Sequence, residues 1–289
     1  MIVPNNNLSV LPFYTSIEQQ NARKWWVYGR VFPLFVPAGY IPPFQIVRTP
    51  GGGPVISSIV LYRADGTRVE DLTSAMMYGL HQVRFNGYDV IVWQSQTPII
   101  PNILNGQYYL VYNGDVVRYS EIFTVVNDIQ PYIKLEWWDI EDFVMDGCRI
   151  VYKYANNTQF KNVLYIPGDI AKPEYIFEEE GVDRDGYFFP IKQISEKRFR
   201  FSFLAPEYML DVMRFVRMSD FVYISKNGQQ WAADTFVMTP EWEDWGDVAA
   251  VNVEFDTDTV AKKIGRGYIQ QTGAGDFNND FNNDYKNKQ

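Results

Sequence analysis

The residues that nucleophilic catalysis requires are scarce in this chain of 289 residues. It has one histidine, His81 in the segment GLHQVRF, and one cysteine, Cys148. A serine triad needs a histidine beside its nucleophile, and no G-x-S-x-G segment is present to expose a serine. A Cys148–His81 pair would have to join two domains that we predict to be separate, so we interpret the cysteine as a buried structural residue. These two residues are also too few for a zinc site.

Two clusters of carboxylates beside aromatic residues suggest glycoside hydrolysis, which uses two acids several ångströms apart. One cluster is Glu136, Asp139, Glu141 and Asp142, and the other is Glu241, Glu243 and Asp244. No spacing singles out a pair, and acids at neighbouring loop positions are usually solvated. We therefore expect no catalytic residue and no enzyme.

Calcium binding is suggested by the last residues of the chain. Asp276, Asn278 and Asp280 match D-x-N-x-D, the opening of an EF-hand loop. The sixth position is Phe281, where the loop needs glycine, and the twelfth is Asn287, where it needs glutamate. We expect a solvated tail with no metal or cofactor, and a weak ion site stays open as the alternative.

Tryptophans offer chemistry of another kind, because an exposed ring can stack on a sugar or anchor a protein interface. In the pairs Trp25-Trp26 and Trp137-Trp138, neighbouring side chains of a strand must point to opposite faces. One ring of each pair is expected in a core and the other outside. Trp242 and Trp245, in PEWEDWGD, are interpreted as loop residues. Ordinary packing between domains is the alternative. The rings that we select as candidate binding residues are Trp26, Trp138, Trp242 and Trp245.

The composition is that of a globular protein, with 46% hydrophobic and 21% charged residues. Its 20 Tyr, 20 Phe and 8 Trp suit either a β-rich core or an interface. The net charge of −9 opposes binding to nucleic acid and docking on a membrane. The N-terminus does not resemble a signal peptide, and no run of about 20 apolar residues predicts a transmembrane helix. A single cysteine is typical of synthesis in a reducing cytoplasm.

A mainly β fold is predicted, beginning with a β-sandwich over residues 1–127. Short runs rich in β-branched and aromatic residues alternate with turn signals, and their spacing favours a sandwich. Residues 108–112, followed by Asn113-Gly114, are predicted to form a hairpin because Asn-Gly accepts a positive φ. The segment 127–131 is predicted to be a domain boundary.

Residues 132–264 are predicted to form a β-rich domain with one helix packed on its sheet. In KRFRFSFL, Phe199, Phe201 and Phe203 alternate with polar residues and are expected to face inward. A helix is predicted near residues 206–218, where Pro206 opens an apolar stripe. That stripe is Met209, Val212, Met213 and Val216.

Two further turns are predicted in this second part. PEYIFEEEGVDRDGYFFP (173–190) is interpreted as an acidic, aromatic loop with a tight turn in which Gly186 supplies the positive φ. A hairpin is predicted around Asn227-Gly228.

Residues 265–289 are expected to form an extended, Asn/Asp-rich C-terminal arm. Its two adjacent Asp-Phe-Asn-Asn units are followed by a third aromatic residue, so Phe277, Phe281 and Tyr285 recur at a period of four. Each buried ring would contribute about 1.5–3 kcal/mol, against an ordering cost of about 1–2 kcal/mol per residue. We expect the arm to lose its freedom only on binding a neighbouring subunit through these rings.

Long segments of the chain resemble structural proteins of tailed bacteriophages and prophages of gut Bacteroides-type bacteria. The resemblance lies in FTVVNDIQ (123–130), KNVLYIPGDIAKPEYIFEEEGVDRDGYFFPIKQISEKRFRFSFLAPEYMLDVMRFVRMSD (161–220) and TPEWEDWGDVAAVNVEFDTDTVAKKIG (239–265). RKWWVYGRVFPLF and IVLYRADG resemble the sandwich domain that accompanies them. The resemblance implies a tail, baseplate or collar component located in the virion, with no enzymatic site. The Asp-Phe-Asn-Asn repeat departs from this pattern.

Two functional hypotheses follow. In the first, the chain is a virion structural protein that binds copies of itself and other tail proteins. In the second, it is a carbohydrate-binding module that stacks exposed tryptophans on host surface glycans. Neither involves nucleic acid or a membrane.

Overall fold

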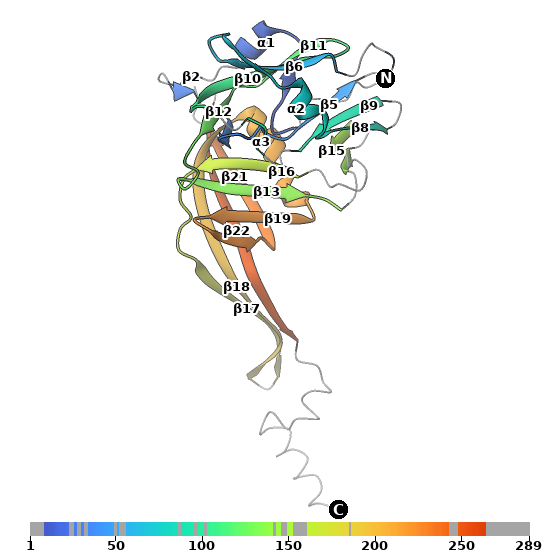
Figure 1. The fold of residues 1–289 in the computed structure, drawn as a ribbon. Coiled ribbons are helices and arrows are strands. Elements are labelled where there is room, and N and C mark those ends of the chain that lie inside the picture. Colours follow the sequence, from blue (N-terminus) through green and yellow to red (C-terminus); the bar gives the residue numbers. More distant parts are fainter. Residues whose placement is uncertain are drawn as a thin grey trace, which may run out of the picture. The chain divides into compact units, whose positions relative to one another are not determined.

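The computed structural model describes residues 9–22, 26–27, 30–31, 34–48, 51, 56–85, 88–94, 98–100, 103–140, 143–145, 149–152, 161–184, 186–242 and 248–263. Over these residues the chain is mainly β, as the sequence predicted, and the strands form several sheets (Figure 1). The helical elements are α1 (Ile17–Ala22), α2 (Thr73–Met77), α3 (Glu207–Met213) and the 3₁₀ turn η2 (Val216–Met218).

The chain divides into two compact units. The first contains residues 1–171 and 200–255, and the second contains residues 172–199 and 256–289. These boundaries differ from the division into 1–127, 132–264 and 265–289 that we expected from the sequence.

An 11-stranded sheet forms most of the first unit. Along it lie β1 (Phe13–Tyr14), β11 (Val117–Ser120), β10 (Gly106–Asn113), β12 (Phe123–Val126), β4 (Leu34–Pro37), β16 (Asn162–Pro167), β13 (Tyr132–Trp138), β19 (Phe221–Lys226) and β20 (Gln229–Ala232). β6 (Ser58–Arg63) pairs with β10 and with β7 (Arg68–Asp71). The strands before and after residues 127–131 therefore belong to one sheet. Its two halves meet at a single register pair, Tyr165 with Phe35.

The remaining strands form smaller sheets. A three-stranded sheet contains β5 (Phe44–Arg48), β9 (Tyr88–Trp93) and β8 (Leu80–Phe85). Two-stranded ladders join β2 (Trp26–Val27) to β3 (Arg30–Val31) and β14 (Phe143–Met145) to β15 (Arg149–Tyr152). A four-stranded sheet has the order β17 (Glu174–Arg184), β18 (Tyr187–Pro206), β22 (Val248–Lys263) and β21 (Thr235–Trp242). The division between the two units falls within β18 and β22.

Aromatic rings join the three-stranded sheet to the large sheet. The ring of Phe13 on β1 lies 5.0 Å from that of Phe44 on β5 and 6.4 Å from that of Tyr112 on β10, both edge to face. Every residue of β5 is buried, which places this strand inside the core rather than at its surface. Such packing of two sheets across an apolar layer is the arrangement that defines a sandwich.

The predicted helix is present as α3, and the 3₁₀ turn η2 continues it to Met218. Pro206 is its N-cap rather than its first residue. Its predicted stripe, Met209, Val212, Met213 and Val216, is buried, and the first three side chains converge with Trp137 of β13. α1 and α2 were not predicted, because each has fewer than two turns of periodic sequence.

The predicted hairpins form, but their turns differ. Asn227 and Gly228 both have positive φ, 51° and 80°, as a two-residue turn between β19 and β20 requires. Between β10 and β11 the hairpin is confirmed, yet Gly114 is not among the residues with positive φ. There the pair Asn113–Val117 closes a three-residue loop, so the Asn-Gly turn that we expected is wrong.

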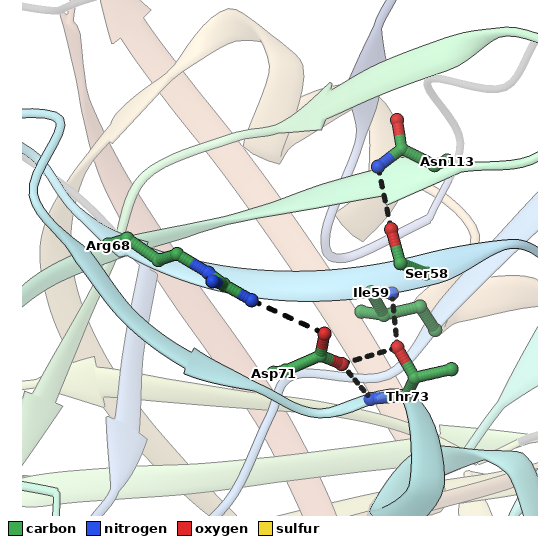
Figure 2. A network of polar contacts seen from close by, with 6 residues as sticks. All are labelled: Ser58, Ile59, Arg68, Asp71, Thr73 and Asn113. Atoms are coloured by element: carbon green, nitrogen blue, oxygen red, sulfur yellow. Dashed lines mark hydrogen bonds and ion pairs between the residues drawn. The ribbon is translucent and has the colours of Figure 1, made fainter.

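A polar network fixes α2 to the edge of β6 and β7 (Figure 2). One carboxylate oxygen of Asp71 accepts from the Thr73 N–H at 3.0 Å and from its hydroxyl at 2.5 Å, and the other lies 3.4 Å from the Arg68 guanidinium. The Thr73 hydroxyl in turn accepts from the Ile59 N–H at 2.9 Å. The hydroxyl and amide of Thr73 hold the pKa of Asp71 below its usual value. The carboxylate therefore acts as a charged anchor for the first turn of a five-residue helix.

Candidate interaction surfaces

The predicted binding residues fall into two groups. Trp138 on β13 and Trp242 on β21 are described with their side chains, and Trp26 lies on β2 with its side chain outside the described part. The others, Trp245, Phe277, Phe281 and Tyr285, lie outside the described residues, as do Cys148 and the Asp276–Asp280 segment. Trp242 is 48% exposed.

The pair Trp137-Trp138 divides between two faces of the large sheet, as predicted. β13 alternates between half-exposed and buried positions over its whole length. Trp137 is 0% exposed and faces α3, while Trp138 is half-exposed on the outer face. Trp138 is therefore the ring of this pair that a ligand or partner could reach.

Both faces of the Trp138 indole are already covered. On the β19 side, the rings of Phe221 and Tyr223 each lie 5.2 Å away and within 24° and 7° of parallel. On the β16 side, the Lys161 ammonium lies 4.1 Å above the centre of the indole (strands in Figure 1). Stacking on sugar needs a free ring face, so this arrangement is that of a cross-strand aromatic cluster.

Two aspartates link the strand ends beside this cluster. The Asp220 N–H donates to Asp139 Oδ1 at 3.1 Å, and the Ile140 N–H donates to Asp220 Oδ2 at 2.8 Å. The Ser219 hydroxyl lies 3.4 Å from Asp139 Oδ2. Burial raises the pKa of Asp139, and the Asp220 charge adds to this, although the hydrogen bond from the Asp220 N–H opposes it. The carboxylates thus tie β13 to β19 by reciprocal hydrogen bonds.

We expect Asp139→Asn to stabilise the protein at neutral pH. The asparagine Oδ1 can still accept from the Asp220 N–H, and its amide can donate to the Ser219 oxygen, whose own proton goes to the Phe215 carbonyl at 3.1 Å. A carboxyl with a raised folded-state pKa binds its proton more tightly when folded. Wild-type stability therefore falls as pH rises above 3.8 through the folded pKa, and Asn removes this fall.

Urea unfolding of wild type and Asp139→Asn, from acidic to neutral pH, measures how the stability of each depends on pH. Asp139→Ala is the control, since it loses the acceptor and is expected to cost about 1–3 kcal/mol. A lower midpoint for Asp139→Asn at neutral pH would show instead that the ionised form is the favoured one.

The carboxylates considered for glycoside hydrolysis have local partners where they are described. Glu136 pairs with Lys134 at 2.8 Å, and Glu241 accepts from the Asn252 amide at 3.3 Å. Glu141, Asp142, Glu243 and Asp244 lie outside the described residues. Within the described ranges no group of three or more potential metal ligands occurs, and no described helix is long and apolar enough to span a membrane.

The largest set of exposed rings lies where we had expected a loop. The described residues of 173–190 include strand β17, a turn at Gly186 with φ 82°, and the start of β18. The loop interpretation is therefore wrong, although the glycine turn inside it is confirmed. We name residues 174–199 the ring hairpin. Of the six aromatic side chains exposed among the described residues, four belong to it: Tyr175, Phe177, Tyr187 and Phe188.

The two faces of the ring hairpin differ in chemistry. The register places Tyr175 opposite Lys197 and Phe177 opposite Ser195, and we name their common side the ring face. Tyr175 is 64% and Phe177 is 73% exposed there. The other side, the charged face, carries the register pairs Glu174–Arg198, Ile176–Glu196, Glu178–Ile194 and Glu180–Lys192. Arg198 also holds Asp256 of β22 through two hydrogen bonds of 2.8 and 3.0 Å.

A bulge keeps Phe188 on the ring face. The register shifts between Glu180 and Gly181, and a Cβ at Gly181 would lie 2.7 Å from the Phe188 ring and 2.3 Å from the Phe189 carbonyl oxygen. A glycine is therefore required at this point, because the Phe189 carbonyl leaves no space for a Cβ.

Sequence reasoning missed these rings although a signal was present. Tyr175 and Phe177 alternate with Glu174 and Glu178, which is a period of two, and the turn that closes the hairpin was recognised. The three successive glutamates and Gly181 suggested a solvated loop instead.

Comparison with models of known protein families found no match, and comparison with curated proteins found none either. Among solved structures, a chain of the "Crystal structure of Dpr2 Ig1-Ig2 in complex with DIP-Theta Ig1-Ig3" matches 80% of this chain and 92% of its own length, at 8% identity and a TM-score of 0.14. A similarity at this level carries no argument about fold or function.

Proposed function

We propose that this chain is a non-enzymatic structural protein of a bacteriophage virion, in the tail, baseplate or collar region, that assembles through the ring hairpin. The observation that carries the proposal is the concentration of exposed aromatic side chains on one hairpin of the second unit. Contiguous exposed apolar surface of this kind marks an interaction site in soluble proteins. The resemblance of long segments to phage structural proteins supplies the assembly in which the hairpin would act.

The hairpin is suited to binding a protein rather than a small molecule. Tyr175 and Phe177 lie on an open sheet face, whereas small ligands are held in concave sites that enclose them. Large, exposed rings are also the residues that contribute most at protein interfaces.

The carbohydrate-binding alternative stays a prediction that now depends on Trp242 rather than Trp138. Trp242 is the more exposed of the two, and the indole faces of Trp138 are occupied. A glycan array on which wild type binds and Trp242→Ala does not would favour this alternative.

Purified virus particles test the virion proposal directly. Peptide mass spectrometry of particles from the source phage or induced prophage should detect this chain in several copies per particle, and cryo-electron microscopy should place it in the tail. Particles that assemble fully without the chain contradict the proposal.

A further inference from the structure

We infer that the ring face of the hairpin is the contact between two copies of this chain, packed sheet against sheet. The inference rests on the proposed role in assembly and adds the identity of the partner and the side of the hairpin that meets it. The ring face contains the register pairs Tyr175–Lys197, Phe177–Ser195, Glu179–Gln193 and Asp183–Phe188.

The edge of β17 is protected against the simplest alternative, addition of a further strand. β17 is the last strand in its sheet, which makes its outer edge available in principle. Glu178, Glu179 and Glu180 follow one another along it. Charges on an edge strand are among the features that prevent edge-to-edge pairing. The rings therefore make contact through a face.

The charges of the ring face favour a second copy as the occupant. The chain carries a net charge of −9, so two copies repel each other wherever their acidic surfaces meet. On the ring face, Glu179 accepts a hydrogen bond from Gln193 at 2.7 Å, and Lys197 pairs with Asp258 at 3.1 Å. Both charges already have partners within their own chain, and Asp183, the register partner of Phe188, is a further carboxylate at the turn end of this face. Two ring faces packed antiparallel hold their Asp183 carboxylates at opposite ends, so they can meet without bringing unpaired like charges together.

The area of the ring face matches a weak, symmetric contact. A buried aromatic side chain covers about 150–250 Å², so Tyr175, Phe177 and Phe188, at 64%, 73% and 49% exposure, offer roughly 300–450 Å² between them. With the flanking polar residues, two copies would bury about 1,000 Å² in total, at the lower end of specific interfaces. We therefore expect a concentration-dependent dimer, which repetition in a particle would reinforce.

Two pairs of substitutions on β17 test which face is used. Tyr175→Ser with Phe177→Ser removes the two most exposed rings, and Glu178→Ser with Glu180→Ser changes as many residues on the charged face. By sedimentation velocity, we expect the ring variant to raise the dimer dissociation constant at least tenfold and the control to leave it the same or lower. Far-UV circular dichroism checks that both variants keep the sheet.

Crosslinking tests the contact with all rings in place. In a Cys148→Ser background, Ser195→Cys places a thiol on the ring face and Glu196→Cys places one on the charged face, one residue away. A bismaleimide that spans the spacing of packed sheets, about 10 Å, should link two copies of the first variant at least tenfold faster than two copies of the second.

Equal crosslinking rates, or a dimer that keeps its affinity without Tyr175 and Phe177, would overturn this inference, as would a wild-type chain that is monomeric at every concentration. None of these results would show whether the chain is present in virus particles. That part of the proposed function is tested separately, by mass spectrometry and cryo-electron microscopy of purified particles.

Discussion

Replacing Trp137 by alanine is expected to lower the free energy of unfolding by about 3–5 kcal/mol, the usual loss for truncating a buried large aromatic residue. Trp137 is 0% exposed and is the residue before the last of β13. Three side chains converge on it: Leu34 of β4, Leu164 of β16 and Met213 of α3. Because three elements pack against one ring, they cannot all move inward to fill the space that its removal leaves.

Its neighbour provides the matched control. Trp138→Ala changes the same residue type on the same strand but removes a half-exposed ring from the outer face. The loss of stacking on Phe221 and Tyr223 should cost about 1–2 kcal/mol. Urea unfolding followed by far-UV circular dichroism measures both variants. Similar losses for the two tryptophans would contradict the assignment of Trp137 to the core.

The features that could be predicted from sequence are those that a single segment determines. Trp137-Trp138 divides between two faces because side chains alternate along a strand, whatever that strand pairs with. The stripe of α3 and the Asn227-Gly228 turn are local in the same sense. Each depends on residues a few positions apart, and each is confirmed.

Strand order could not be predicted in this way. β12 pairs in parallel with β4, about ninety residues earlier in the chain, and β16 meets β4 at one register pair. No local pattern identifies such partners, because many of the described strands offer similar β-branched and aromatic faces. The segment 127–131 has the composition of a linker, and it connects strands that the sheet nevertheless joins. The ring hairpin was missed for another reason. The glutamates at 178–180, which lie on the edge strand β17, resemble the acidic residues of a solvated loop.

Replacing Arg48 by methionine is expected to destabilise the first unit by about 3–5 kcal/mol, because it leaves a buried carboxylate without its guanidinium. Arg48 of β5 lies opposite Asp89 of β9, with 3.8 Å between Nε and Oδ2. Both residues are buried. The Arg48 side chain also hydrogen-bonds Tyr112 on the large sheet, and burial raises the pKa of that tyrosine to about 12. Arg48 thus links two sheets by charge and hydrogen bond where Phe13 links them by packing.

The double variant Arg48→Met with Asp89→Leu separates the cost of an unpaired charge from the value of the pair itself. Apolar residues of similar size often replace a buried ion pair with little loss, so the double variant should recover most of the stability lost by the single one. Urea midpoints for wild type, both single variants and the double variant complete the cycle. A double variant as unstable as Arg48→Met would show that the hydrogen bond to Tyr112, rather than the charge on Asp89, is what the arginine chiefly supplies. The polar link between the two sheets would then be a hydrogen bond at the buried phenol, beside the packing of the Phe13 ring.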